Sequence, residues 1–497
     1  MGCRRWKGRS SSWSAVSYGS MKVLVVGATG FIGKTTVAFL LGKGHEVTAW
    51  VRNAEKATDM LGDGVRIESS IVSAEDLKLR LEEADAVINL AGRPLAGVRW
   101  TSKKKIEFYE SRVSLTNLIS DAISKCKNPP KVLISASAVG IYGNSGSTAV
   151  DEESDVGKDY LSDLCSQWEE AANKSIDSRV RVCNIRIGVV LGREGGMLQQ
   201  LTQSFDLGVG SYLGDGKQSV PWIHIIDVVR AIGFCIDQKE LNGPINFTAP
   251  YSASGKEFAK ILASLTNAFI TIPMPKFILK LIFGEGEIVL TNSQNPLPSK
   301  LLRFGFRFEY EHLKSALKAE IQPEKVIVSK PEISANGLSY ASKAQYELKT
   351  YLTLNCDQKT AFDFFSSPLN LGLTTPSWLN FKITEIPPYV SENCEIAYEI
   401  RLWFLPIKWR TNILEWNPHE SFIDTQKKGP YKLWVHSHFV ESTSETTSMM
   451  TDIVRYSVSG GPLGRLIHFL VIKKSLIRIF AYRRSMMRMR FGYPTCD

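Results

Sequence analysis

The chain has 497 residues, of which 44% are hydrophobic and 22% are charged, a composition typical of a folded protein with two or three domains. Disordered and fibrous proteins are therefore excluded. The eight cysteines form no CxxC pair and no Cys/His cluster, so we expect neither a disulfide framework nor a metal site. This use of cysteine favours a cytoplasmic protein.

The net charge of +10 is concentrated at the two ends of the chain. Four basic residues lie in the first 20 positions and nine lie between Arg455 and Arg490. The rest of the chain is slightly acidic, so we expect no nucleic-acid partner. Apolar runs stay below the ~18 to 20 residues of a membrane span. We interpret residues 1–20 as a disordered basic extension before a start at Met21, with a targeting segment as the alternative.

From Met21 onwards, short apolar runs alternate with longer amphipathic stretches, a pattern typical of βαβ units and a parallel sheet. It predicts strands at Lys22–Val26, Glu46–Val51, Val65–Glu68, Ala86–Leu90, Lys131–Ser135 and Val180–Ile187. It predicts helices at Phe31–Gly42, Ala74–Glu83, Lys103–Lys127 and Tyr160–Ser175. We therefore expect an α/β domain of the doubly wound Rossmann type over residues 21–320, with a small substrate lobe over about 189–320.

A polar segment with Pro323 and Pro331 predicts a linker over residues 321–344. The pattern then changes to strand-type alternation at Tyr346–Leu354, Cys394–Leu402, Trp409–Trp416, Ser421–Gln426, Lys432–Val440 and Thr447–Tyr456. A long helix follows, and together these elements predict an α+β helix-grip domain over residues 345–492. We expect the sheet to use the whole apolar face of that helix, which leaves at most a weak peripheral membrane contact through its basic face.

A glycine-rich turn, Gly27-Ala-Thr-Gly-Phe-Ile-Gly33, follows the first predicted strand. Pyrophosphate requires backbone N–H groups and a helix N-terminus at close range, and glycine permits that approach because it lacks a Cβ atom. The position between a strand and a helix therefore predicts a dinucleotide site. We expect the site to be formed by Gly27, Thr29, Gly30, Phe31, Ile32 and Gly33.

Arg52 follows the second strand, where an acid would select the ribose hydroxyl of NAD. An arginine there can pair with a 2′-phosphate, so we predict NADP as the cofactor, with NAD as the alternative. The fourth strand ends in Asn89-Leu-Ala-Gly92, at the sheet edge where cofactors bind. Asn89, Ala91 and Gly92 are therefore further candidates for the cofactor site, and a tight structural turn is the alternative.

These features resemble the extended or atypical short-chain dehydrogenase/reductases known as epimerase family proteins. Further matching segments are Arg99-Trp100, Ser111-Arg112, Ser135-Ala-Ser-Ala-Val-Gly-Ile-Tyr-Gly143, Arg186-Ile-Gly-Val-Val-Leu-Gly192 and Trp222-Ile-His-Ile-Ile-Asp227. Residues 273–317 are similar to the small C-terminal extension of this group. Residues 345–492 resemble the START-like (SRPBCC, polyketide cyclase-like) proteins, mainly in Gly429-Pro-Tyr-Lys-Leu-Trp-Val-His436 and Gly461-Pro-Leu-Gly464.

The resemblance implies an NADP(H)-binding oxidoreductase or epimerase of unknown substrate. Such enzymes use a serine and a Tyr-x-x-x-Lys pair, in which the lysine lowers the pKa of the phenol. Ser137 matches the serine, but Leu161 and Cys165 stand at the tyrosine and lysine positions. Tyr160 is a weak candidate acid. The alternative is a catalytically silent NADP(H)-sensing protein, since some relatives carry names linked to cell division.

Two residues are candidates for contact with a small-molecule substrate. Arg112 could hold a phosphate or carboxylate group, or belong to a surface ion-pair network, which is the interpretation we favour for Arg99. Tyr142 could donate a proton or pack in the core. His224 and Asp227, three positions apart, are interpreted as structural first. The sequence indicates no oligomeric state.

The second predicted domain is rich in tryptophan, with Trp378, Trp403, Trp409, Trp416 and Trp434. These rings could line a pocket for a lipid or aromatic ligand, or form ordinary core. His436 and His438 share one face of a predicted strand, where they could bind a polar head group. Without a third ligand or an acid, two histidines do not define a metal site.

Overall fold

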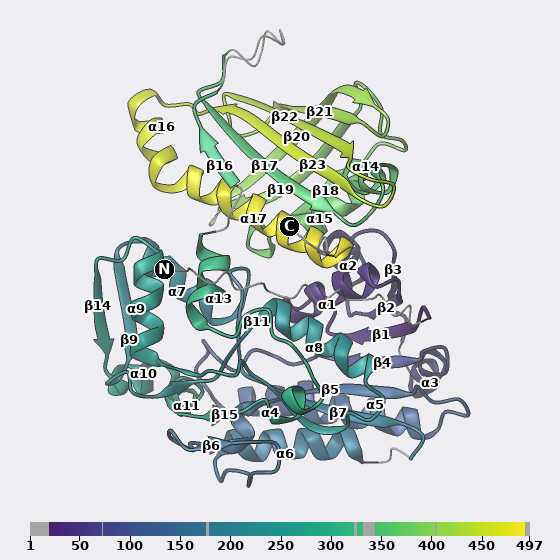
Figure 1. The fold of residues 1–497 in the computed structure, drawn as a ribbon, viewed down its shortest axis with the longest axis vertical. Coiled ribbons are helices and arrows are strands. Elements are labelled where there is room, and N and C mark those ends of the chain that lie inside the picture. Colours follow the sequence, from purple (N-terminus) through teal and green to yellow (C-terminus); the bar gives the residue numbers. More distant parts are fainter. Residues whose placement is uncertain are drawn as a thin grey trace, which may run out of the picture.

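The computed structural model describes residues 19–71, 73–174, 178–322, 326–331, 343–402 and 405–492. Two domains are stacked on each other (Figure 1). The first is built on a parallel sheet and the second on an antiparallel sheet, and the helix α17 (Lys473–Phe491) lies between them.

The first domain contains a seven-stranded sheet in the order β12-β7-β5-β4-β1-β2-β3, with all neighbours parallel. Its strands are β1 (Lys22–Val26), β2 (Glu46–Trp50), β3 (Val65–Glu68), β4 (Ala86–Asn89), β5 (Val132–Ala138), β7 (Arg181–Ile187) and β12 (Gly243–Phe247). The central strands read as continuous apolar runs because helices cover both faces of the sheet. The predicted Rossmann-type sheet is confirmed.

Helices pack on both faces of this sheet. α1 (Phe31–Gly42), α2 (Ala54–Leu61) and α8 (Ile225–Asp237) share a core with one face, whereas the other face is covered by α3 (Ala74–Glu82), α5 (Leu115–Ser124) and α6 (Tyr160–Asn173). The predicted helix at Lys103–Lys127 is α4 (Ser102–Tyr109) and α5, joined by a π-helical turn at Glu110–Ser114. The sequence pattern missed α2 because only two of its residues, Ala57 and Leu61, are buried.

The predicted substrate lobe lies beside the sheet and has a core of its own, which includes Leu198, Phe205, Trp222 and Leu262. Its helices are α7 (Gly196–Asp206), α9 (Gly255–Leu265), α10 (Lys276–Phe283), α11 (Ile288–Thr291), α12 (Ser299–Arg303) and α13 (Leu313–Ile321). Its short strands are β6 (Ala149–Val150), β8 (Val189–Leu191), β9 (Val209–Leu213), β10 (Ser219–Val220), β11 (Trp222–His224), β13 (Ala253–Ser254), β14 (Ile270–Met274) and β15 (Asn295–Pro296).

The second domain contains an eight-stranded antiparallel sheet in the order β16-β17-β23-β22-β21-β20-β19-β18. The strands are β16 (Val326–Ser329), β17 (Tyr346–Leu354), β18 (Lys382–Glu385), β19 (Glu395–Leu402), β20 (Leu405–Asn417), β21 (Ser421–Lys428), β22 (Leu433–Ser442) and β23 (Ser448–Ser457). Its helices are α14 (Gln358–Ser366), α15 (Leu371–Thr374), α16 (Gly461–Ile467) and α17. β16 lies inside the predicted linker, between Pro323 and Pro331, and these prolines concealed this short edge strand, which pairs with β17.

One continuous core joins the two domains. Leu476 and Phe480 of α17 pack on the antiparallel sheet, whereas Met486 and Met487 belong to a cluster that includes Ile225, Ile226 and Val229 of α8. α17 also lies along α1, so closely that a Cβ atom at Gly42 would stand 2.4 Å from the carbonyl oxygen of Arg490. The helix that closes the second sheet therefore also docks it on the first domain.

The segment from α16 to the start of α17 projects from the second domain (Figure 1). Large apolar side chains are exposed there, namely Leu463, Leu466, Ile467, Phe469 and Leu470. Our expectation that the sheet uses the whole apolar face of the final helix is therefore wrong for its first turns. The exposed side chains lie on α16 and on the π-helical turn at His468–Ile472, which precedes α17. In the described part of the chain, no helix is long and apolar enough to cross a membrane.

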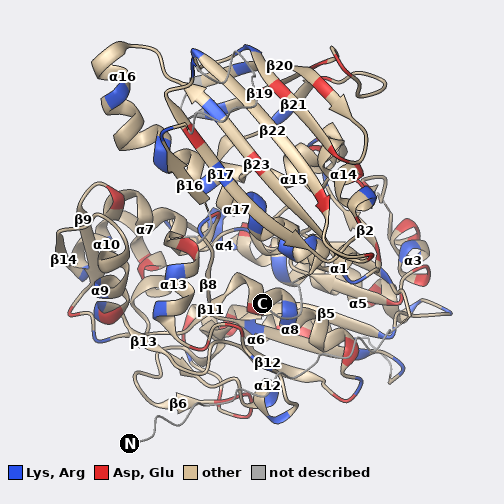
Figure 2. Cartoon of the chain, turned by 45° about the horizontal axis from the view of Figure 1, so that its top comes forward, with Lys and Arg blue, Asp and Glu red and all other residues tan. Residues whose placement is uncertain are grey.

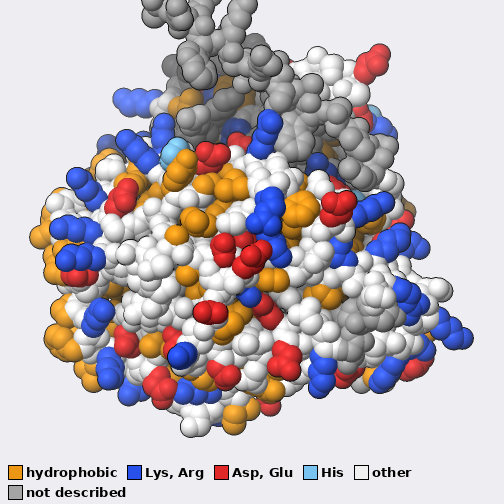
Figure 3. Space-filling view, turned by 60° about the horizontal axis from the view of Figure 1, so that its bottom comes forward, with side chains coloured by type: hydrophobic (Ala, Val, Ile, Leu, Met, Phe, Trp, Pro, Cys, Tyr) orange, Lys and Arg blue, Asp and Glu red, His pale blue; other side chains and the backbone are white. Residues whose placement is uncertain are grey.

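Charge is unevenly distributed over the molecule. Figure 2 shows Lys and Arg residues on α16 and α17. On the face of the first domain seen in Figure 3, basic, acidic and apolar side chains are interspersed. Eight of the nine basic residues at this end of the sequence lie on α16 and α17, whereas Arg455 lies on β23.

Candidate functional site

The glycine turn after β1 is folded as tightly as its composition suggests. Gly27 has φ +81°, and a Cβ atom there would stand 2.8 Å from the carbonyl carbon of Leu90 at the end of β4. A Cβ atom at Gly33 would stand 2.1 Å from the carbonyl oxygen of Gly27. The N–H of Gly30 donates to that same oxygen at 3.0 Å. Only glycine at positions 27 and 33 lets α1 begin this close to β1 and β4.

The first turn of α1 is a suitable anion site. Gly30 is its N-cap residue, and no side chain accepts a hydrogen bond from the first turn. No acidic residue lies in that turn. The N–H groups at the start of a helix have no partner within it, and they lie at the positive end of the helix dipole. The N-terminus beside Phe31 and Ile32 can therefore accept a phosphate group.

Strand register brings the predicted cofactor residues to one edge of the sheet. Val26, the last residue of β1, pairs with Trp50 of β2 and with Asn89 of β4. Arg52 lies two residues after β2 and is exposed, so its guanidinium can approach a ligand from solvent. The turn after Asn89 lies on the opposite side of the glycine turn. The three segments thus surround the start of α1.

The Asn89 side chain has a structural role in the turn after β4. It donates to the Thr116 hydroxyl at 2.9 Å and accepts from the N–H of Ala91 at 3.3 Å. Both contacts shape the turn, and Asn89 is only 1% exposed. Ala91 and Gly92 remain at the edge with accessible backbone. The tight-turn alternative therefore describes Asn89, whereas Ala91 and Gly92 stay cofactor candidates.

Ser137 belongs to a buried polar network. Its hydroxyl donates to Glu169 at 2.7 Å, and Glu169 forms a two-point ion pair with Arg186, with distances of 2.8 and 2.9 Å. Arg186 also donates to the Tyr142 hydroxyl at 2.8 Å, which in turn donates to Asn246 at 2.7 Å. Burial raises the pKa of Tyr142 to about 12. The structure thus favours the core interpretation of Tyr142 over substrate contact.

The positions that carry Tyr and Lys in active dehydrogenases are apolar here. Leu161 and Cys165 lie in the core against Gly140, and burial raises the pKa of the Cys165 thiol to about 12. Tyr160 is half-buried, with Trp100 at its edge and the Lys105 ammonium 4.7 Å above its ring. Burial also raises the pKa of Tyr160. Its phenol can therefore donate a proton but is a poor base.

Arg112 is a buried cation at the edge of the site. It lies in the π-helical turn, 8% exposed, with its guanidinium against Gly92 and 5.2 Å from the ring of Trp168. It donates to the Arg93 carbonyl oxygen at 2.7 Å, and no ion pair of Arg112 occurs within the described residues. Burial lowers its pKa to about 10. The surface ion-pair interpretation is therefore wrong for Arg112, and an anionic ligand would complete its surroundings.

Three other residues have structural partners. Arg99 is exposed and donates to the carbonyl oxygen of Leu281. His224 caps α8, lies 3.0 Å from Glu320 and packs against the ring of Tyr310 at a tilt. Asp227 accepts from the N–H groups of Glu309 and Tyr310. His224 and Asp227 thus hold the segment at 309–320 against α8, in agreement with the structural interpretation.

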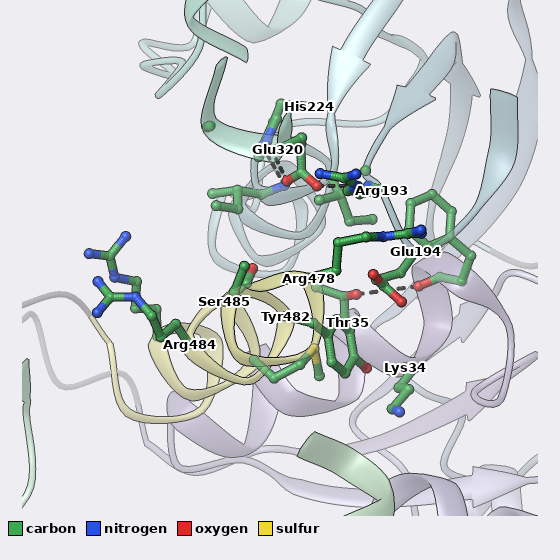
Figure 4. A pocket seen from close by; sticks show the side chains of 18 of the residues that line it. Lys34, Thr35, Arg193, Glu194, His224, Glu320, Arg478, Tyr482, Arg484 and Ser485 are labelled. Atoms are coloured by element: carbon green, nitrogen blue, oxygen red, sulfur yellow. Dashed lines mark hydrogen bonds and ion pairs between the residues drawn. The ribbon is translucent and has the colours of Figure 1, made fainter. Parts of the chain in front are cut away.

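A cavity of about 500 Å³ opens at the start of α1 and is closed on the other side by α17. Thr29, Gly30 and Phe31 line it from the glycine turn, and Arg478, Tyr482 and Ser485 line it from α17. Figure 4 shows His224, Glu320 and Arg193 together above this helix. The second domain thus contributes a wall at the entrance to the predicted nucleotide site.

Two charged residues are buried where the domains meet. Lys34 of α1 donates to the carbonyl oxygens of Gly372 at 2.8 Å and Thr375 at 3.2 Å, both in the second domain. Burial lowers the pKa of Lys34 to about 7, and it raises the pKa of Glu194 to about 7. A second cavity, of about 390 Å³, is lined by Lys34 and extends to Asn53 and Lys56 at the start of α2. The domain junction therefore runs from the glycine turn towards the segment that carries Arg52.

Sequence reasoning missed the residues that only the tertiary structure brings together. Glu169, Arg186 and Asn246 come from α6, β7 and β12, and no local pattern marks them as partners of Ser137 or Tyr142. Lys34 sits on a helix that was predicted correctly, and its amphipathic pattern gave no sign of a second domain. Trp403 lies outside the described residues.

The parallel sheet, the glycine turn and the uncapped start of α1 define a dinucleotide-binding protein of the Rossmann type. The NAD dependent epimerase/dehydratase family matches residues 23–247, and a domain of unknown function, DUF1731, matches residues 274–320. The chain is 38% identical to the chloroplastic "Epimerase family protein SDR39U1 homolog" of Arabidopsis thaliana over 306 residues, 61% of this chain and 87% of that protein. It is 33% identical to "Epimerase family protein YfhF" of Bacillus subtilis, over 62% of this chain and all of that protein.

The chain therefore belongs to the NAD dependent epimerase/dehydratase family, and the small extension after the Rossmann domain is present. A solved structure, human epimerase family protein SDR39U1 (isoform 2) with NADPH, is 32% identical to it. That structure covers 61% of this chain and 100% of its own, with a TM-score of 0.56. The family match ends before the antiparallel-sheet domain.

Proposed function

We propose that this protein binds NADPH on the glycine turn and the first turn of α1. The observation that carries the proposal is the helix start at Gly30, which has no capping side chain and no acid beside it. Arg52 is exposed at the end of β2, where it can reach a 2′-phosphate. The human relative crystallised with NADPH supports the same cofactor. NAD is the alternative dinucleotide.

Replacing Arg52 by alanine should weaken NADPH binding about 10-fold to 100-fold, since a hydrogen bond to a charged group contributes about 1.5–3 kcal/mol. The affinity for NADH should hardly change, because NADH has no 2′-phosphate. Isothermal titration calorimetry of the wild type and of Arg52→Ala with both cofactors measures the difference. Arg66→Ala, an exposed arginine on β3, is the matched control. Equal losses for both cofactors would contradict a phosphate contact.

We further propose an oxidoreductase or epimerase activity on an anionic substrate, with Arg112 as the anchor for its phosphate or carboxylate group. Arg112 is buried, lacks an acidic partner among the described residues and touches Gly92 at the sheet edge. Ser137 would orient a substrate oxygen after exchanging its hydrogen bond with Glu169. Tyr160 would donate a proton. The missing lysine makes turnover slow, because the phenol pKa is raised and not lowered.

Arg112→Met should reduce the affinity of NADPH-saturated protein for an added anion at least 10-fold. Saturation with NADPH removes the glycine turn from the competition for phosphate. Titration calorimetry with inorganic phosphate then measures the phosphate affinity of the remaining site. Arg99→Met serves as the control, because Arg99 is exposed and donates a hydrogen bond to a carbonyl oxygen. Equal phosphate affinity in the wild type and Arg112→Met would contradict the role of Arg112.

The rival function is an NADPH sensor without catalysis. The cavity at Gly30 favours the sensor function, because α17 of the second domain forms its opposite wall. A bound cofactor would therefore contact α17 and could change how the second domain is held. Assays of NADPH oxidation against a library of carbonyl compounds separate the two functions. Turnover that Ser137→Ala abolishes supports the enzyme. Tight NADPH binding without turnover, together with a change in protease sensitivity of the second domain, supports the sensor.

We propose that the second domain is START-like and holds a lipid or aromatic ligand. An antiparallel sheet facing a long C-terminal helix is the arrangement of helix-grip proteins, and Trp409, Trp434 and Tyr456 cluster between the two. Trp416 joins a second cluster with Phe362 and Phe422. Native mass spectrometry of the purified chain would identify a retained ligand. If the delipidated protein binds neither a fatty acyl probe nor an aromatic probe, this proposal is contradicted.

We also propose that α16 and the π-helical turn after it touch the surface of an anionic membrane. Leu466 and Phe469 are 54% and 69% exposed, and Arg465 and Lys473 lie beside them. Apolar insertion combined with basic residues is the usual mode of peripheral binding.

The double variant Leu466→Glu/Phe469→Glu should lower partitioning onto vesicles of phosphatidylcholine and phosphatidylserine at least tenfold, since each large apolar side chain contributes about 1.5–3 kcal/mol on burial. Flotation measures the bound fraction. Phe277→Glu on α10, whose phenylalanine is 72% exposed, is the control for loss of an exposed apolar side chain. Equal flotation of all three proteins, or none of the wild type, would contradict membrane contact.

A further inference from the structure

Four titratable side chains meet between the antiparallel sheet and α17. Asp424 on β21 lies directly opposite His436 on β22, and Asp452 on β23 lies directly opposite His438 on β22. Because side chains alternate along a strand, all four point to the same face of the sheet. Their exposed fractions are between 5% and 13%. Phe480 of α17, 5.5 Å from His436 between ring centres, shows that this is the face covered by the helix.

The two imidazole rings lie against each other at a tilt of 39°, with centroids 3.7 Å apart, and the two carboxylates lie at different edges of this pair. Nδ1 of His436 and Nε2 of His438 face Oδ1 of Asp424, at 3.7 and 3.1 Å. Nε2 of His436 and Nδ1 of His438 face Oδ1 of Asp452, at 3.1 and 2.9 Å. All four ring nitrogens are therefore close to a carboxylate oxygen.

Two neutral imidazole rings do not satisfy this arrangement. A neutral imidazole carries one N–H and one lone pair, so two neutral rings supply two protons for four contacts. Two lone pairs must then face carboxylate oxygens, which repel them. Nδ1 of His438 indeed has no hydrogen-bond partner among the described residues. Both rings are packed against aromatic side chains, His436 against Phe480 and His438 against Phe422.

A cation at the Asp424 edge removes the conflict. It would accept the lone pairs of Nδ1 of His436 and Nε2 of His438, together with Oδ1 of Asp424; ligand atoms of these three residues lie within 4.8 Å of one another. Each histidine would then donate its remaining N–H to Asp452. Carboxylates accept the outer N–H of metal-bound histidines in this way. Arg483 of α17 lies 3.6 Å from the other oxygen of Asp452 and would hold it in place.

We propose that Asp424, His436 and His438 bind a divalent transition metal ion of the Zn²⁺ type, with Asp452 as the positioning residue for both histidines. Two imidazoles and one carboxylate are a ligand set that Zn²⁺ accepts, with one coordination position left for water or another ligand. The site lies between the two aromatic clusters of the second domain and is separate from the nucleotide site. The sequence motif His436-Ser-His438 could not reveal it, because both acids come from other strands.

Cobalt is the probe for this site, since four-coordinate Co²⁺ absorbs in the visible range and Zn²⁺ does not. The full chain, expressed without a polyhistidine tag and treated with a chelator, is titrated with Co²⁺ and then with Zn²⁺. We expect saturation near one equivalent, visible absorption of four-coordinate Co²⁺ and its loss when Zn²⁺ is added. Less than a tenth of an equivalent bound by folded wild type overturns the proposal.

The variants His438→Gln and Asp424→Asn keep the shape of the side chains and should weaken Co²⁺ binding at least 100-fold. Asp452→Asn should keep the coloured complex but weaken it about 10-fold to 100-fold, as expected for an outer partner of metal-bound histidine. His419→Gln, an exposed histidine of the same domain, is the matched control and should bind normally. Unchanged affinity in both ligand variants overturns the proposal. If a ligand variant does not fold, the test is made on the wild type alone. Its melting temperature should rise on addition of Zn²⁺, and an unchanged melting temperature overturns the proposal.

Discussion

Replacing Gly30 by valine is expected to weaken NADPH binding at least 100-fold and to leave the fold intact. Gly30 has φ −75°, which any residue adopts, and its position is exposed. The nearest atom to an added Cβ is the carbonyl oxygen of Gly27, at 3.2 Å, a tight contact that a small shift can relieve. The valine methyl groups, however, would stand over the helix N–H groups that a phosphate must approach. A 100-fold loss corresponds to about 2.7 kcal/mol of binding free energy.

Titration calorimetry with NADPH gives the affinity, and a thermal melt without cofactor shows whether the variant is folded. Gly44→Val is the matched control, since Gly44 lies beyond the other end of α1 with nothing within 4 Å of an added Cβ. Its φ of +82° should make that control less stable by about 1 kcal/mol, with unchanged affinity. Wild-type affinity in a folded Gly30→Val protein would contradict the placement of the phosphate on α1.

The elements of the first domain could be predicted because their signals are local. β1, β3 and α1 have the predicted ends, since a glycine lies directly next to one end of each: Gly27 after β1, Gly64 before β3 and Gly30 before α1. α2 and β16 were missed for the opposite reason: each has few buried side chains, and each is held by neighbours distant in sequence. β16, for example, is stabilised by pairing with β17. Propensity alone does not mark such elements.

The residues of the candidate site also fall into two groups: those that a local sequence signal predicts, and those that only the folded chain brings together. The glycine turn and Arg52 are readable because a phosphate site needs a strand, a turn and a helix in immediate succession. Whether Arg112 is a surface residue or a buried anchor depends on the π-helical turn that rotates it towards Gly92, and the sequence does not encode that turn in any simple pattern. The environment of Ser137 depends on Glu169 and Arg186, which join it only in the folded chain.

The Gly372→Val variant is expected to separate the two domains without unfolding either of them. A Cβ atom at Gly372 in α15 would stand 1.4 Å from the carbonyl oxygen of Asp59 in α2, a backbone atom that cannot move aside alone. Displacing α15 would also remove both carbonyl acceptors from the buried Lys34 ammonium. Leaving the buried Lys34 side chain without acceptors would destabilise the docked arrangement by a further ~1–3 kcal/mol or more. Small-angle scattering should show a larger radius of gyration, and limited proteolysis should release two stable fragments.

Gly42→Val should disrupt the same domain interface from the side of the first domain, since its Cβ would stand 2.4 Å from the carbonyl oxygen of Arg490 in α17. The two variants should therefore have the same phenotype. Gly429→Val is the control within the second domain, because the atoms nearest to its Cβ belong to the long side chain of Gln426. If α17 senses the nucleotide through the cavity at Gly30, both interface variants should also change NADPH affinity, whereas Gly429→Val should not. Compact scattering profiles for both interface variants would mean that the domains are joined by contacts other than α1–α17 and α2–α15.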